Sequence, residues 1–211
     1  MPVGRPSLAH TAAPAPISGF ELPVPKALQP FALRDHRGRV FDNASLASRW
    51  TLLLFGYTHC VDTCPTTLVE MSEVRRRLAA RYADIPTAAV FVTVDPKRDT
   101  QERLAEYAAR FGEGLVAVGG APGAIKALAG QFRVQYSQRP GASGARGYDV
   151  DHTTSVTLLG PDGKLYAVFT LPLRPARVAE DVARIHAMHP EARCDAGSAS
   201  GRDPSCSTRS T

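Results

Sequence analysis

One stretch of the chain decides the fold: residues 50–65 read WTLLLFGYTHCVDTCP. The apolar run Trp50–Phe55 is typical of a strand that is buried on both faces. Pro65 suits the first turn of a helix, and apolar side chains then recur at helical spacing to about Arg81. The stretch therefore predicts a core strand, a loop that carries Cys60 and Cys64, and a helix.

The same alternation of strand and helix patterns continues along the chain. Two short strands flank a turn at 35–40, and further strands are expected at 88–94, 115–118, 134–136, 156–159 and 165–170. Further helices are expected from a capping box at Asp99–Glu102, at 122–132 and at 174–188. The order predicts an α/β fold, a thioredoxin-like sandwich whose central mixed sheet is flanked by helices.

Length and composition predict one folded domain. The chain has 211 residues, of which 44% are hydrophobic, and this is enough for a substantial core. Residues 1–25 are rich in proline and alanine and predict a flexible arm, so the domain is expected at 26–190. Residues 191–211 are rich in serine, glycine and aspartate and predict a disordered tail, which contains Cys194 and Cys206.

The charge argues against a nucleic-acid partner, and the hydropathy argues against a membrane span and a signal peptide. The net charge is +5 and the arginines are scattered, so we expect no nucleic-acid partner. No apolar stretch approaches the roughly 20 residues of a membrane span, and the first 15 residues lack the apolar core of a signal peptide. We therefore expect either a cytoplasmic protein or a printed start that lies downstream of a targeting segment.

The two cysteines of the opening stretch form the strongest candidate site. They lie between the end of a strand and the start of a helix, a position that lowers the pKa of a thiol. Four helical steps between Cys60 and Cys64 rise about 6 Å, near the upper limit of the Cα separation in a disulfide. The pair can therefore form a disulfide or bind one soft metal ion with a third ligand. Two buried structural cysteines are the competing interpretation.

His152 is the candidate third ligand. It follows the loop predicted at Gln138–Gly147 and starts a strand, where a plain surface histidine is the competing interpretation. Two thiolates and one imidazole suit Cu(I), and also accept Cu(II) or zinc. His59 adjoins Cys60, but neighbouring side chains in an extended turn point apart, so we expect it to pack beside the site rather than to bind the ion.

Other polar residues give weaker signals. Asp95 ends the strand next to the cysteine strand and should lie at the same edge, where it can support a ligand. Asp99 is explained by a turn and a helix start. His186, His189 and Cys194 form a possible second metal site, but solvated residues at a frayed helix end are the better interpretation.

The motifs together resemble the Sco/SenC family. The matching segments are FGYTHC at 55–60, CPTTL at 64–68, VDP and RDT at 94–100, and DH at 151–152, within a resemblance that runs from about Phe20 to Met188. Val61 stands where many members have proline and Thr63 where many have valine, and neither change removes a ligand. The tail with Cys194 and Cys206 is not expected of the family.

The resemblance implies a thioredoxin-like fold on the periplasmic side of a membrane, although the usual anchor is missing here. It implies copper bound by Cys60, Cys64 and His152, with Asp95 in support. The implied role is to help assemble the binuclear copper centre of cytochrome c oxidase, by delivering copper to the accepting subunit or by reducing its cysteines. A thioredoxin-like reductant or another copper chaperone would be a further partner.

Three alternatives remain open from the residues. The first is a thiol–disulfide oxidoreductase in which copper is secondary, with Cys60 attacking and Cys64 resolving. The second is a peroxidase of the peroxiredoxin type, which is weak because its motif requires proline and threonine where this chain has Leu53 and Tyr57. The third is a binding module without metal, which a failure of the reduced protein to bind any metal would reveal.

Overall fold

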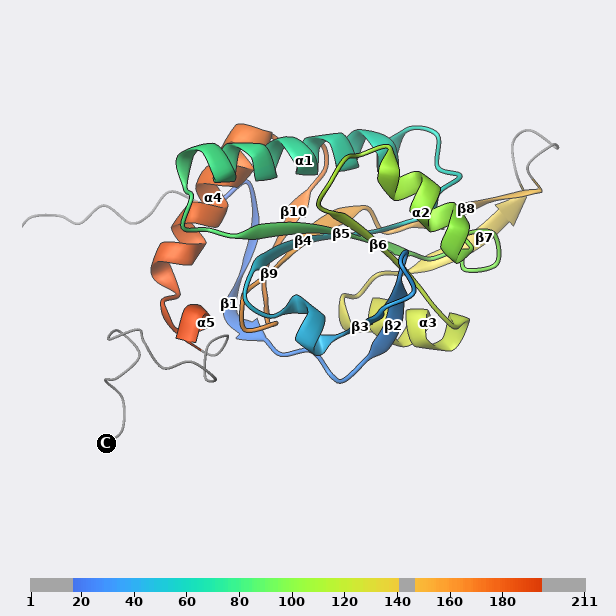
Figure 1. Ribbon diagram of the computed structural model, residues 1–211, viewed down its shortest axis with the longest axis horizontal. Helices are drawn as coiled ribbons and strands as arrows, with labels where there is room; N and C mark the ends of the chain where they lie inside the picture. The colour runs from blue at the N-terminus through green and yellow to red at the C-terminus, as the bar shows by residue number, and fades with distance from the viewer. Residues whose placement is uncertain (1–16, 141–146, 195–211) are drawn as a thin grey trace, which may run out of the picture.

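An eight-stranded mixed sheet runs through the centre of the computed structural model, which describes residues 17–140 and 147–194 (Figure 1). Its spatial order is β1-β10-β9-β4-β5-β6-β2-β3. The strands of this sheet are β1 (Gly19–Lys26), β2 (Ala32–Asp35), β3 (Val40–Asp42), β4 (Trp50–Gly56), β5 (Thr87–Thr93), β6 (Leu115–Gly119), β9 (Ser155–Leu159) and β10 (Leu165–Thr170).

Helices cover both faces of this sheet. They are α1 (Thr63–Arg81), α2 (Gln101–Ala109), α3 (Pro122–Gln131), α4 (Pro175–Met188) and the short α5 (Glu191–Cys194), with a 3₁₀ turn at Asn43–Leu46. In Figure 1, α1 lies above the sheet, with α4 on the left and α2 on the right, and α3 lies below the sheet. The predicted thioredoxin-like sandwich with a mixed central sheet and flanking helices is confirmed.

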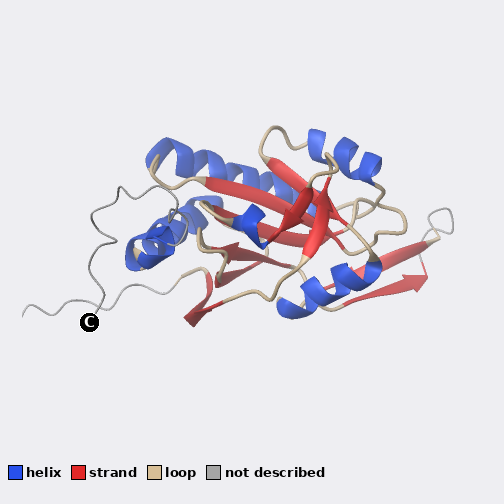
Figure 2. Ribbon diagram, turned by 60° about the horizontal axis from the view of Figure 1, so that its bottom comes forward, coloured by secondary structure: helices blue, strands red, loops and turns tan. Residues whose placement is uncertain are grey.

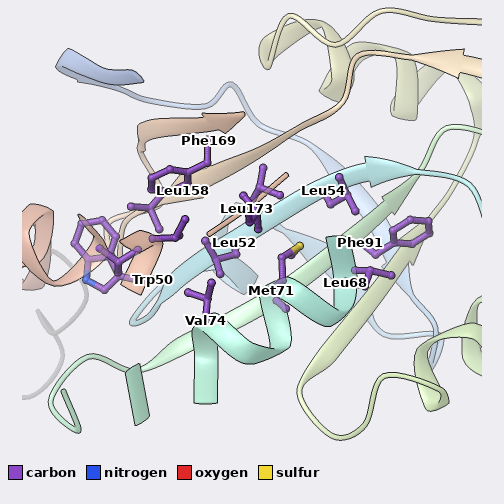
Figure 3. Packing of buried hydrophobic residues seen from close by; sticks show 14 of the residues in the cluster. Trp50, Leu52, Leu54, Leu68, Met71, Val74, Phe91, Leu158, Phe169 and Leu173 are labelled. Carbon is purple, nitrogen blue, oxygen red and sulfur yellow. The ribbon is translucent and has the colours of Figure 1, made fainter. Parts of the chain in front are cut away.

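β4 is the central strand, and its position explains its sequence. It pairs in parallel with β5 and in antiparallel with β9, so it has no free edge. Leu52 and Leu54 point to the side of α1, where Figure 3 shows Leu68 and Met71. Residues of α4 belong to the same core cluster. Leu53 and Phe55 point to the other side and pack in the layer that includes α3. All seven residues of β4 are buried, as the uninterrupted apolar run predicts.

A separate two-stranded sheet carries His152. Its strands, β7 (Tyr136–Pro140) and β8 (Tyr148–His152), are antiparallel and pair with each other, outside the eight-stranded sheet. In Figures 1 and 2 this hairpin projects from the body of the molecule at the end where β4 meets α1. The ladder pairs Tyr136 with His152, so His152 lies at the base of the hairpin, next to the body.

Four expectations about boundaries are wrong. Residues 19–25 of the predicted arm form most of β1, which pairs with β10, because an edge strand tolerates prolines such as Pro23 and Pro25. The strand predicted at 134–136 runs from Tyr136 to Pro140 and takes three residues from the predicted loop. His152 ends a strand instead of starting one. The predicted tail contributes α5, and its residues 195–211 lie outside the described residues.

Within the described residues, no helix combines the length and the apolar character that crossing a membrane requires.

Candidate metal and thiol site

The cysteine pair occupies the loop and first helical turn that follow β4. Cys60 closes a turn, in which its N–H donates to the carbonyl of Tyr57 at 3.1 Å, and α1 begins three residues later. Cys64 lies in the first turn of α1 and is buried, while Cys60 is partly exposed. Both are free thiols, and the backbone N–H of Cys64 donates to Sγ of Cys60 at 3.4 Å. The pair thus has an accessible sulfur and a buried one.

Gly56, the last residue of β4, makes room for the buried sulfur. A Cβ added there would lie 2.7 Å from Sγ of Cys64 and 2.7 Å from a ring carbon of Phe91. Carbon and sulfur atoms do not approach so closely without repulsion. Glycine is therefore required by the close approach of α1 to the end of the strand.

The two thiols share one proton unequally. A hydrogen bond from the Cys64 thiol, joined by backbone hydrogen bonds and by His152, lowers the pKa of Cys60 to about 5 despite partial burial. The same hydrogen bond, with desolvation and the nearby Cys60 charge, raises the pKa of Cys64. At neutral pH Cys60 is therefore a thiolate and Cys64 a thiol.

His152 meets this pair from the hairpin. Its Nε2 lies 3.8 Å from Sγ of Cys64, and its ring stands edge-on to the ring of Tyr57 with centroids 6.0 Å apart. Its Nδ1 lies 3.0 Å from the carbonyl oxygen of Thr153. Because a carbonyl only accepts, the neutral ring carries its proton on Nδ1 and turns the lone pair of Nε2 toward Cys64. This tautomer leaves Nε2 able to bind a metal ion.

The predicted ligands gather, but their side chains are not arranged around one point. Across residues 17–140 and 147–192, no group of three histidine, cysteine or acidic side chains has the geometry to hold a metal ion as it stands. The Cys64–His152 contact supplies two donors, and Cys60 lies beside them. The donor set fits a soft ion chemically, and binding all three donors to one ion requires side-chain movement.

Asp95 lies at the predicted edge, but it acts on the hairpin rather than on a cysteine. Its buried carboxylate accepts a hydrogen bond from the hydroxyl of Tyr148 at 2.7 Å and forms an ion pair with Arg98. Arg98 also donates to the carbonyl of Tyr148 at 2.7 Å. Asp95 therefore links the end of β5 to the first residue of β8.

Asp99 is the residue that sequence reasoning missed. Its buried carboxylate accepts hydrogen bonds from the N–H and hydroxyl of Thr58, at 3.0 and 2.7 Å, and from the hydroxyl of Thr93 at 2.6 Å. The cap of α2 is Thr100 instead, whose hydroxyl accepts from the N–H of Arg103. Asp99 thus braces the cysteine loop, and the same-edge argument applied to Asp95 would have found it.

The other histidines take structural positions. His59 lies 3.6 Å from Asp99, beside the site as expected. His186 is buried, so the prediction of a solvated helix end is wrong for it, and its Nδ1 accepts a hydrogen bond from the indole of Trp50 at 2.9 Å. His189 is placed between Glu21 and Glu191. The side chain of Cys194, the third member of this possible site, lies outside the described residues.

Solvent reaches the histidine side of the site through a cavity of about 850 Å³. Lys126 and Gly130 of α3 form one wall, and residues 135–137 and 151–153 of the hairpin form another. His152 belongs to the second wall, so the imidazole borders both Cys64 and an open surface.

Comparisons with known proteins agree on one family. A family model described as SCO1/SenC matches residues 22–187. The mitochondrial SCO2 homolog of Bos taurus is 40% identical over 152 residues, which are 72% of this chain and 55% of the bovine protein. The chain thus spans just over half the length of that relative.

Solved structures give the same answer. ScoI from Bradyrhizobium japonicum with copper bound is 35% identical, with a TM-score of 0.66 over 75% of this chain and 99% of that one. ScoI from Arabidopsis thaliana with copper bound is 28% identical, with a TM-score of 0.72 over 76% of this chain and 98% of that one. The sequence match and the fold match therefore cover the same region.

Proposed function

This chain belongs to the SCO1/SenC family, and we propose that it binds copper to help assemble the binuclear copper centre of cytochrome c oxidase. The observation that carries the proposal is the 3.8 Å contact between Sγ of Cys64 and Nε2 of His152, beside the thiol of Cys60. The copper bound in the two ScoI structures supports it. The family membership that the motifs predicted is confirmed by these matches.

The proposed ligands are Cys60, Cys64 and His152, and copper is the cargo. Thiolate sulfur and imidazole nitrogen are the donors that Cu(I) prefers. Cys60 is a thiolate at neutral pH and is accessible to an arriving ion. Cys64 must lose its proton to bind, so loading releases a proton and requires the reduced pair. Nε2 of His152 already presents its lone pair and needs only a small shift.

The proposed partner is the copper-accepting subunit of cytochrome c oxidase, on the periplasmic side of the inner membrane. A thioredoxin-like reductant or another copper chaperone would regenerate or load the site. The cavity beside His152 supports transfer of copper from this side of the site, because an accepting thiol can approach the solvent-facing imidazole first. Departure of His152 would leave copper on two sulfurs, a lower coordination number that favours exchange.

Copper titration of the reduced protein tests the ligand set. We expect one Cu(I) or Cu(II) per chain and, with Cu(II), thiolate charge-transfer absorption that shifts or disappears in His152→Ala. Cys60→Ser should weaken Cu(I) binding by at least about 10-fold, since a thiolate donor is lost. His189→Gln, at the far end of α4, is the matched control. Retained tight binding in Cys60→Ser, or an unchanged spectrum in His152→Ala, would contradict the assignment.

A thiol–disulfide reductase is the second candidate, favoured by the partly exposed, low-pKa Cys60 beside the buried, protonated Cys64. The Cys60 thiolate would attack one sulfur of a target disulfide, breaking that bond and releasing the other sulfur as a thiolate. Cys64 would then pass its proton to this leaving sulfur and attack Cys60. The target gains two electrons, and the protein forms the Cys60–Cys64 disulfide.

A reduction assay separates the two candidates. The metal-free, reduced protein is mixed with an oxidised target disulfide, and the rate is compared between the wild type and His152→Ala. If reduction survives in His152→Ala while copper binding is lost, disulfide exchange is favoured as the main activity. If the wild type reduces no faster than a free thiol such as glutathione, this candidate is refuted.

A further inference from the structure

The hairpin that carries His152 depends on the body of the protein for its position. β7 and β8 form their own two-stranded sheet, outside the ladder of the eight-stranded one. A two-stranded hairpin is at best marginally stable by itself. Its orientation, and with it the location of His152, must therefore be set by side-chain contacts to the rest of the chain.

One set of polar contacts is made at the opposite end of β8 from His152. The guanidinium of Arg98 lies 3.7 Å from the ring centroid of Tyr148 and donates to the carbonyl of the same residue. The hydroxyl of Tyr148 donates to Asp95, which also holds Arg98. The side chain of Asp95 is fully buried and that of Arg98 is 16% exposed. Tyr148 is thus held by its ring, its hydroxyl and its backbone.

We propose that Tyr148, clamped by Arg98 and Asp95, is a positioning residue that sets the contact between His152 and Cys64. This inference rests on the proposed function and deepens it, because it concerns how one proposed copper ligand is held. Tyr148 does not touch the ligand, and its effect on copper is transmitted along β8.

The geometry of β8 makes this transmission direct. Tyr148 and His152 are four residues apart, about 13 Å along a strand. The strand is stiffened by its ladder with β7, so a tilt of the hairpin by 10° about one end moves the other by about 2 Å. Sγ of Cys64 and Nε2 of His152 are 3.8 Å apart, and a displacement of that size would break their contact.

Further contacts hold the hairpin nearer its base, where the buried Val150 packs in the core layer that includes α3. The ring of Tyr57 meets His152 edge-on at 6.0 Å, and the backbone N–H of Val150 donates a hydrogen bond to the Tyr57 hydroxyl. Arg98 lies 5.8 Å from the centroid of the Tyr57 ring. Tyr57 therefore guides the base, while the buried ion pair at Tyr148 anchors the distal end.

A double-mutant cycle tests the proposal. Tyr148→Phe removes the hydroxyl and keeps the ring and the backbone carbonyl. We expect it to weaken Cu(I) binding by about 10-fold, a typical cost of losing a residue that orients a ligand. In a His152→Ala background the same substitution should change affinity by less than about twofold, because the residue through which it acts is absent. Equal losses in both backgrounds, or none in either, would overturn the proposal.

Arg139→Gln is the matched control on the same hairpin. Arg139 pairs with Asp149 and Asp151 across the ladder, at 3.5 and 2.7 Å. Its loss weakens the hairpin without touching the clamp, so we expect copper affinity to stay within about twofold of the wild type. A 10-fold loss in this variant would indicate that general hairpin stability matters rather than the clamp, and would overturn the assignment.

A metal-free measurement keeps this proposal separate from the copper function. Nuclear Overhauser contacts between the rings of Tyr57 and His152 should be present in the wild type and weakened in Tyr148→Phe. If the wild type binds no copper, the proposed function fails, and these ring contacts alone decide the positioning role. Unchanged ring contacts in Tyr148→Phe would refute that role whatever the copper titration gives.

Discussion

Replacing Gly56 by alanine tests whether Cys64 is packed as tightly as the structure indicates. The new Cβ would lie 2.7 Å from Sγ of Cys64 and 2.7 Å from a ring carbon of Phe91. Ordinary contacts of this kind are about 3.5–4.0 Å, so both neighbours would have to retreat by about 1 Å. Neither has room, because Cys64 is fixed in the first turn of α1 and Phe91 lies in β5. Overpacking of a core costs about 1–3 kcal/mol.

For a chain of this size, such a loss lowers the melting temperature by about 2–4 °C for each kcal/mol. Thermal and urea unfolding of the reduced, metal-free protein measure it directly. Gly130→Ala is the control, because a Cβ there meets nothing within 4 Å and alanine favours the helix α3. In a Cys64→Ala background, Gly56→Ala should cost less, since one of its two neighbours is gone. Full stability of Gly56→Ala would refute the packing argument.

Three further outcomes follow from the site and the core. The pKa of Cys60 is lowered to about 5 from an ordinary 9.0, so its ionisation stabilises the folded state fully above pH 9, and this contribution is lost as the pH falls through 5. The rate of alkylation of Cys60, followed by mass spectrometry, should stay high down to about pH 5, and a rate midpoint near pH 9 would contradict this. Asp99→Asn should cost about 1–3 kcal/mol and speed hydrogen exchange at the Thr58 amide, because charge-assisted hydrogen bonds are lost; unchanged exchange at Thr58 would argue against the brace. Trp50→Phe removes the buried indole N–H that donates a hydrogen bond to His186, and it should lower the free energy of unfolding by about 1–3 kcal/mol. Urea unfolding followed by circular dichroism measures this loss, and an unchanged stability would show that this hydrogen bond contributes nothing.

The central part of the fold could be read from the sequence because its signals are local. The apolar run before Cys60 predicts β4, and Pro65 with the spacing after it predicts α1, which ends at Arg81 as expected. The hairpin of β9 and β10 follows from the turn at Gly160–Gly163. β1 could not be predicted in this way, since its two prolines read as an arm and its pairing with β10 spans most of the chain.

The sequence predicts three ligands for the candidate site, and it identifies Asp95, but not Asp99, as a supporting carboxylate. The motifs point to Cys60, Cys64 and His152, and the structure brings Cys64 and His152 into contact. The pattern at Asp99–Glu102 is typical of a helix cap, and a cap explains an aspartate at position 99 without any contact to the cysteine loop. The hydrogen bonds from Thr58 to Asp99 depend on β4 and β5 lying side by side, so they follow from the same-edge argument and not from any short window of sequence.

The separation of the hairpin from the main sheet divides the site between two cooperative units. β4 and α1 belong to the buried core, so we expect their amides to exchange with solvent only on global unfolding. β7 and β8 pair only with each other, so we expect them to open at a lower free-energy cost than the core. An ion held by Cys64 and His152 would cross-link the two units, so loading would slow amide exchange in the hairpin and leave the core unchanged. The rate of amide exchange in the hairpin would then measure how much of the protein holds copper.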